Sequence, residues 1–250
     1  MKVADQQELL SSYEQVLEHN LEVMRMSHNE GMHEQTVLLL LKMNRDEDAY
    51  NFIKWLAAID PDGNYDWGMI PESTKGGEWL YLEGQNRFED LFKVGSRKQH
   101  LFPMNYLVAL ALIKFRILAE YQKRKMEFEE LEKTLLGTKY EFFVTHEPII
   151  HVFKLNLFGY CTKVFEEQEK HLENYLDLND KRNPVLLKAL VNPKPLMAQK
   201  FPIWTGTDGS PNEARYVMWG CLTLFQRTPG AIDKVAARFD GAVSYDPTFI

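Results

Sequence analysis

The sequence predicts an all-α protein, built as an irregular array of antiparallel helices with one long loop rich in glycine, proline and aromatic residues. Two observations predict this fold class. Apolar residues recur at intervals of three and four over most of the 250 residues, as they do on one face of a helix. No segment shows the alternation of apolar and polar residues that is typical of a half-buried strand.

Three helices joined by short turns are predicted before residue 60. Residues 5–28, 32–43 and 45–58 each carry an apolar face with helical spacing. Gly31 is expected to end the first helix, because glycine is common just after the last helical residue. The chain is expected to turn at Asn44 into the third helix. These helices form an array of helical hairpins.

A long loop is predicted at residues 59–87. It is dense in glycine and proline, which no regular element tolerates at this frequency. Loops of this length within compact domains are uncommon and are often functional, so the segment is interpreted as an ordered excursion or a lid. The residues that break regular structure are Pro61, Gly63, Gly68, Pro71, Gly76, Gly77 and Gly84.

The longest predicted helix spans residues 104–136 and follows a short element at 88–92. Pro103 precedes its first turn, and Gly137 can end it. Its first half is apolar on nearly all sides, whereas its second half is charged with a single apolar stripe. This pattern predicts a helix that passes from the centre of the protein to its rim.

Four more helices are predicted in the rest of the chain. Asn183 is expected to cap one of them, and Ser210 with Glu213 gives the start signal of another. Residues 192–210 are rich in proline and glycine and predict a connection. The predicted helices are 148–176, 184–190, one that begins at Pro211, and one within 228–239.

Paired helices joined by short turns resemble the hairpins of helical-repeat solenoids, in which neighbouring hairpins bury each other's apolar faces. No fixed period of about 34 residues is present. The predicted architecture is therefore TPR-like only in an irregular sense. We expect a single domain over residues 1–250, with halves at 1–137 and 138–250.

Composition and charge restrict the function. The net charge of −7 offers no electrostatic attraction to phosphate backbones or to an anionic bilayer, so nucleic acid and membranes are not expected partners. A basic protein or peptide partner would suit this charge. The first residues lack the apolar stretch of a secretion signal, and the two cysteines lie far apart. We expect an intracellular protein, cytoplasmic or nuclear.

Acidic and amide side chains alternate after the third helix, as do the ligands of an EF-hand calcium loop. The remaining positions do not fit, because Tyr65 stands where that loop has glycine and Pro71 where it has glutamate. Turn chemistry explains the same residues, so no metal and no other cofactor is predicted. The alternating residues are Asp60, Asp62, Asn64 and Asp66.

Histidines also give no metal signature. His146 and His151 are five residues apart with Pro148 between them, so they lack the one-turn spacing of a zinc-protease motif. Neither a nucleophile elbow nor a phosphate-binding glycine loop is present, so no catalytic residue is assigned.

Aromatic residues gather around the long loop. Packing of the loop onto the third helix explains them better than a ligand or peptide groove does, but the groove remains open as an alternative. The candidate binding residues are Trp55, Asp60, Asp62, Tyr65, Asp66, Trp67 and Trp79.

Two functional hypotheses follow. The first is a helical scaffold that binds a protein or peptide and is not an enzyme. The second is a small-ligand binder or enzyme with a pocket under the 59–87 loop, in which Asp60, Asp62 or Asp66 would act as acid–base groups. A closed apolar pocket with a desolvated carboxylate favours the second hypothesis, and an open groove lined by helices favours the first.

Residues 19–68 resemble the amino-terminal helical region of a family of fungal and algal proteins, many of which carry a MYND-type zinc finger. The similarity lies in "DAYNFIKW" followed by "DPDGNYDWG", and residues 209–233 resemble the family helix before a "TPGA" turn. A MYND finger needs a dense series of cysteines, and Cys161 and Cys221 cannot supply it. The resemblance implies a helical interaction module without the finger.

Overall fold

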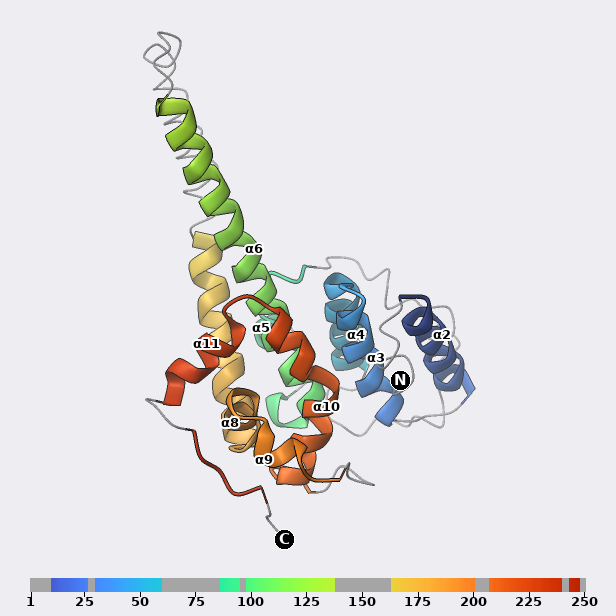
Figure 1. Ribbon diagram of the computed structural model, residues 1–250. Helices are drawn as coiled ribbons and strands as arrows, with labels where there is room; N and C mark the ends of the chain where they lie inside the picture. The colour runs from blue at the N-terminus through green and yellow to red at the C-terminus, as the bar shows by residue number, and fades with distance from the viewer. Residues whose placement is uncertain are drawn as a thin grey trace.

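The computed structural model of the chain is helical wherever it is described (Figure 1). Helices and short 3-10 turns are present in the described residues, and no strand is. The prediction of an all-α fold is confirmed. Among the described helices, none is both long and apolar enough to cross a membrane. The described ranges are 10–26, 30–59, 86–94, 98–137, 163–200, 207–239 and 243–247.

The first three helices match the predicted array of hairpins. They are α2 (Leu10–Met26), α3 (Glu30–Lys42) and α4 (Asp46–Ile59), and each contacts the next. The expectation that Gly31 ends the first helix is wrong, because Gly31 lies in the first turn of α3. Glycine adopts helical backbone angles as well as others, and its cost within a helix is about 0.5–1 kcal/mol of conformational entropy relative to alanine.

The turn between α3 and α4 is at Asn44, as predicted. Its φ of 57° lies in the left-handed region, which asparagine tolerates better than most residues. The N–H of Arg45 returns to the carbonyl of Leu40 at 2.9 Å, so a carbonyl at the end of α3 is satisfied across the turn.

The long helix α6 (Met104–Gly137) ends at the predicted glycine. Residues 104–115 are all buried, whereas residues 122–127 are all exposed. Figure 1 shows the second half of α6 projecting from the body of the protein. The prediction of a helix that runs from centre to rim is confirmed.

Between α4 and α6 lie two short elements, α5 (Leu91–Val94) and the 3-10 turn η3 (Gln99–Leu101). The predicted element at 88–92 is therefore placed too early. Asp90 begins α5, because its carboxylate accepts from the N–H of Phe92 at 3.1 Å.

The helix predicted at 148–176 is helical over its described residues 163–182, so its predicted end at 176 is wrong. It continues to the residue before Asn183, where Pro184 prevents further extension. The side-chain oxygen of Asn183 accepts from the N–H groups of Val185 and Leu186, as expected of a cap. The helix itself begins at Leu186, two residues later than predicted. That helix is α8 (Leu186–Val191).

The C-terminal part holds α9 (Lys194–Met197), α10 (Pro211–Arg227), α11 (Ala231–Ala236) and the 3-10 turn η4 (Ala237–Phe239). The short α9 lies within a segment predicted as connection, so that prediction is wrong there; Pro193 can precede a helix because it only fixes φ and lacks an N–H. The start of α10 is as predicted, because Ser210 Oγ accepts from the N–H of Glu213 at 3.2 Å.

One hydrophobic core joins these helices, with buried residues from α3, α4, α6, the 163–182 helix, α8, α10 and α11. α10 contacts both α3 and α6. This closeness depends on Gly220, because a Cβ there would meet Leu38 Cδ1 of α3 at 2.4 Å. In a linear repeat array each hairpin contacts only its neighbours, and the contact of α10 with α3 differs from that pattern. The TPR-like arrangement and the division into halves stay predictions.

Candidate functional site

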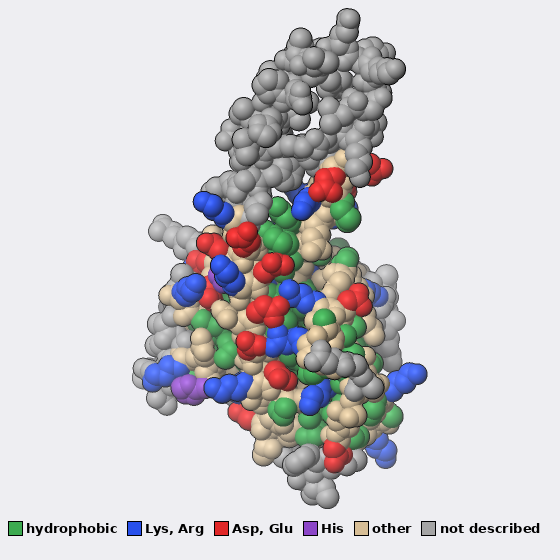
Figure 2. All heavy atoms as spheres, turned by 90° about the vertical axis from the view of Figure 1, so that its left-hand side faces the viewer, with side chains coloured by type: hydrophobic (Ala, Val, Ile, Leu, Met, Phe, Trp, Pro, Cys, Tyr) green, Lys and Arg blue, Asp and Glu red, His purple; other side chains and the backbone are tan. Residues whose placement is uncertain are grey.

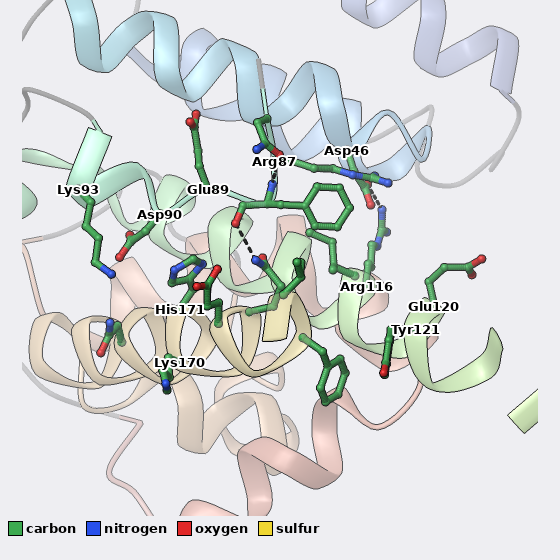
Figure 3. A pocket seen from close by; sticks show the side chains of 18 of the residues that line it. Asp46, Arg87, Glu89, Asp90, Lys93, Arg116, Glu120, Tyr121, Lys170 and His171 are labelled. Atoms are coloured by element: carbon green, nitrogen blue, oxygen red, sulfur yellow. Dashed lines mark hydrogen bonds and ion pairs between the residues drawn. The ribbon is translucent and has the colours of Figure 1, made fainter. Parts of the chain in front are cut away.

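A cleft of about 1400 Å³ lies between α6, the 163–182 helix and the segment 86–94. Figure 3 shows its lining side chains projecting from these elements. This volume exceeds the usual range of about 300–1,000 Å³ for small-molecule pockets. The cleft is a candidate functional site because apolar rings and charged side chains from three elements line it.

One side of the cleft, the segment that includes Arg87 and Glu89, is held by a buried lysine, Lys114 of α6. Its side chain is fully buried, and its Nζ donates to the backbone carbonyls of Arg87 at 2.7 Å and Glu89 at 2.8 Å. The third donor of the ammonium goes to Oε1 of Gln168 at 2.8 Å. An ammonium has three donors, and all of them are used here.

Gln168, on the 163–182 helix, completes this arrangement. Its Nε2 donates to the carbonyl of Phe88 at 2.6 Å, which orients its Oε1 toward Lys114. Three consecutive carbonyls, those of residues 87, 88 and 89, are thus held by two buried side chains from two helices. We call residues 86–90 the strap. The strap has no regular secondary structure, so these side chains replace the backbone partners that a helix would supply.

Two carboxylates also tie down the strap. Glu89 Oε1 accepts from Tyr50 at 2.8 Å and forms an ion pair with Lys54 at 2.7 Å. Asp90 accepts from the hydroxyl of Tyr175 at 3.3 Å, and the same hydroxyl accepts from the N–H of Leu91 at 3.2 Å. Burial raises the pKa of both tyrosines, so they are neutral donors at physiological pH.

Burial also lowers the pKa of Lys114 to about 7, while the carboxylates of Asp90 and Glu89 limit the fall. A lysine with such a pKa can serve as a base or nucleophile when it is accessible. Lys114 is fully buried and its three donors are engaged, so the geometry supports a structural role in holding the strap.

The strap presents an apolar side chain to the cleft. The ring of Phe88 is 40% exposed, and the guanidinium of Arg87 lies 5.6 Å from its centroid. Tyr121 of α6 stacks on Phe165 of the 163–182 helix, with 4.3 Å between ring centroids. With Ile117 and Val164, these rings form the apolar part of the lining.

We call the part of the cleft beside Arg116, Glu120 and Tyr121 its outer end. Charged groups there are mostly paired. Arg116 Nη1 bonds to Asp46, and Arg124 forms an ion pair with Glu120 at 2.7 Å. Arg87 pairs with Glu47 at 3.3 Å. Figure 2 shows acidic and basic side chains interspersed on one face, without a continuous patch of one sign.

At the inner end of the cleft, the imidazole of His171 is 7% exposed, and its Nδ1 has no hydrogen-bond partner among the described residues. Burial lowers the pKa of His171, and the nearby charge of Lys114 lowers it further. The ring is therefore neutral at physiological pH.

The candidate residues predicted from the sequence do not lie in this cleft as far as they are described. Trp55 packs against the core, with its ring 5.7 Å from that of Phe52. The other candidates lie outside the described residues, so neither the turn nor the pocket predicted under the 59–87 loop is tested. Those residues are Asp60, Asp62, Tyr65, Asp66, Trp67 and Trp79.

Sequence reasoning missed the cleft, although it had one usable signal. Lys114 directly follows the apolar run 106–113 in the half of the helix that is apolar on nearly all sides. A charged residue in a helix half that is apolar on all sides must be buried, and a buried charge needs partners. No sequence pattern indicates that the strap and Gln168 supply them.

The described residues contain no cluster of His, Cys, Asp and Glu arranged to hold a metal ion. Of the two cysteines, Cys221 is a free thiol in the core, and burial raises its pKa to about 12, which makes it unreactive. Cys161, His146 and His151 lie outside the described residues.

Comparisons with protein-family models, with curated proteins and with solved structures find no match to this chain. The resemblance to the MYND-associated helical family stays a prediction, and the function has to be argued from the cleft itself.

Proposed function

We propose that this chain is a helical scaffold that binds a segment of another protein in the cleft between α6, the strap and the 163–182 helix. The observation that carries the proposal is the strap itself. Two buried side chains hold its carbonyls, and its Phe88 ring is left 40% exposed over the cleft. Because the backbone of the strap is already held in place, ordering it on binding costs little entropy.

The shape of the cleft supports a peptide occupant over a small molecule. Its volume is large, it is lined by two helices, and its apolar rings lie beside paired charges. Protein interfaces commonly combine aromatic anchors with a polar rim. The described carboxylates Glu89 and Asp90 already accept hydrogen bonds from buried tyrosines, which leaves them poorly placed for acid–base catalysis.

Several expectations from the sequence belong to this proposal. They are the irregular TPR-like build, the kinship with the MYND-associated helical region, and an intracellular site in cytoplasm or nucleus. The absence of nucleic-acid binding and the preference for a basic partner follow from the net charge of −7. The preference for a basic partner concerns the surface as a whole, because the charges at the outer end of the cleft are mostly paired with one another.

The proposal is tested by selecting binders from a random peptide library and measuring their affinity by fluorescence polarisation. Phe88→Ala should weaken binding about tenfold or more, because burying an aromatic side chain contributes about 1.5–3 kcal/mol. Phe88 is partly exposed, so the melting temperature should change little.

Trp219→Ala is the matched control, because it removes an exposed aromatic side chain of α10 that does not line the cleft. The control should bind the selected peptides like the wild type. Peptides that bind equally well to the Phe88→Ala variant, or that need Trp219 instead, would contradict the proposal.

A further inference from the structure

The C-terminal segment 243–247 lies across the junction of α8 and α9, where hydrogen bonds hold it. The segment has no helix or strand, and Figure 1 shows it as an extended trace beside the C-terminal helices. None of its residues is buried, and half-buried and exposed residues alternate along it. It therefore lies on the helical body as an extended peptide.

Tyr245 anchors this segment. Its hydroxyl donates to the carbonyl of Asn192 at 2.7 Å, and its ring packs against the hydrophobic core. Asn192 follows the last residue of α8, where a carbonyl has no partner within the helix. Burial raises the pKa of Tyr245, and the nearby N–H of Leu196 limits the rise, so the hydroxyl is a neutral donor at physiological pH. The junction thus presents an acceptor that suits a phenol hydroxyl.

Side-chain amides hold the backbone of the segment on both sides of this anchor. Asn192 Nδ2 donates to the carbonyl of Val243 at 3.5 Å, and Gln199 Nε2 donates to the carbonyl of Pro247 at 2.9 Å. In the recognition of extended peptides, backbone contacts supply affinity and side-chain contacts supply specificity. Here the amides select an extended backbone, and the contact with the hydroxyl selects tyrosine.

Gln199 is held in place from the core side. The side chain of Arg215, on α10, is 6% exposed and donates to Oε1 of Gln199 and to the carbonyl of Lys200. With its oxygen engaged by Arg215, Gln199 directs its amide nitrogen toward the segment. A side chain that is fixed before a ligand arrives loses little entropy on binding. The amide is therefore part of a preformed site.

The segment can leave this site without unfolding a helix, because its residues belong to none. Its departure would free the carbonyl of Asn192 and the amide of Gln199 for another extended segment. Only residues 240–242 separate it from Phe239, the last residue of η4. So short a connection gives the resident segment an effective concentration on the order of millimolar. The segment thus competes with any ligand from outside.

We infer that the junction of α8 and α9 is a docking site for an extended, tyrosine-bearing segment of another protein, and that residues 243–247 occupy it until such a segment replaces them. The carbonyls that the amides would hold lie two residues before and two residues after the tyrosine. The site is separate from the cleft, so the inference does not depend on the proposed function.

The length of the connection favours another protein over a second copy of this chain. A second copy would have to bring its own η4 to within about 14 Å of the junction, since four residue steps separate Phe239 from Val243. A segment of a different protein has no such restriction.

The first test uses a fluorescein-labelled peptide with the sequence of residues 240–250. It is titrated into the full-length Tyr245→Ala variant, whose own segment lacks the anchor, and fluorescence polarisation is followed. Saturable binding is expected, and the wild type should bind at least tenfold more weakly because its own segment competes. Circular dichroism checks that the variant folds; should it not fold, Tyr245→Phe takes its place, since it removes only the hydroxyl.

The second test concerns the chemistry of the site. A peptide with Phe in place of Tyr should bind the Tyr245→Ala variant about fivefold more weakly, the effect of one hydrogen bond. A phosphotyrosine peptide should not bind, because its phosphate replaces a donor with acceptor oxygens. Adding Gln199→Met should weaken binding of the unmodified peptide, whereas adding Lys194→Ala, at an exposed position of α9, should not.

Three outcomes would overturn the inference. The first is that no saturable binding occurs to the variant that has lost the anchor. The second is equal binding of the Tyr, Phe and phosphotyrosine peptides, which would show that the hydroxyl is not recognised. The third is a concentration-dependent dimer of the wild type that Tyr245→Ala abolishes, which would make a second copy the occupant. Analytical ultracentrifugation measures this last outcome.

Discussion

At the residue scale, Lys114 organises the candidate site. A charged side chain in a fully buried position is costly unless it is hydrogen-bonded, and here three acceptors from two segments surround it. Its removal would leave the carbonyls of Arg87 and Glu89 and the amide oxygen of Gln168 without this donor. Lys114→Met, which keeps the volume of the side chain, should lower the free energy of unfolding by about 3 kcal/mol.

The same lysine predicts a pH dependence. Its pKa of about 7 in the folded protein lies below its ordinary value of 10.5. Between these two pH values the unfolded chain binds more protons than the folded chain, so the free energy of unfolding should rise with pH. The rise should approach 1.4 kcal/mol per pH unit at most and should be missing in Lys114→Met.

Urea denaturation at several pH values between about 6.5 and 9.5 measures this effect. Lys125→Met, an exposed position on the same helix, should follow the wild type. If the stability difference between wild type and Lys114→Met narrows as the pH rises, the pKa of Lys114 is raised in the folded state and the prediction is wrong.

At the scale of elements, the approach of α10 to α3 depends on a missing side chain. Gly220 faces Leu38, which is itself 2% exposed and has little room to move. Helices approach closely where one of them has a glycine, and added volume in a packed core is destabilising. The contact joins segments about 180 residues apart in the sequence, so it closes the array.

Gly220→Val should therefore lower the free energy of unfolding by about 2–3 kcal/mol, since the valine methyl groups would displace Leu38. Valine has a higher helix propensity than glycine, so propensity does not account for a loss of stability. Thr223→Val, at an exposed position on the same helix, is the control for a valine in α10 that meets no neighbouring helix. Thermal unfolding followed by circular dichroism compares the two variants. Equal melting temperatures for both would show that α3 and α10 separate without cost.

At the scale of the whole molecule, the described helices from both halves of the chain share one core. Phe115 of α6 contacts Phe225 of α10, with 5.9 Å between ring centroids. Lys234 and Arg238, near the C-terminus, pair with Glu173 of the 163–182 helix. These contacts predict that the two parts lose structure together.

Phe225→Ala should destabilise the protein by about 3–5 kcal/mol. Hydrogen exchange followed by mass spectrometry should show faster exchange in α3 and α6 as well as in α10, because the cavity lies in a shared core. Faster exchange confined to α10 and α11 would mean that the halves 1–137 and 138–250 unfold independently.

Much of the fold was predictable because helix signals are local. The apolar spacing of residues 104–115, the stop at Gly137 and the caps at Asn183 and Ser210 each depend on residues within a turn or two. The errors are local too. Glycine follows the last residue of many helices, so the sequence predicts a stop at Gly31, but glycine can also occupy a helical position at a modest entropic cost.

The sequence by itself determined that the chain is helical and that α6 passes from a buried first half to an exposed second half, because helical periodicity and capping are properties of neighbouring residues. Only the tertiary structure decided where the cleft lies and what Lys114 does. Its partners are 25 to 54 residues away, and a hydrogen bond across that separation depends on how the helices pack, which no spacing in the sequence records.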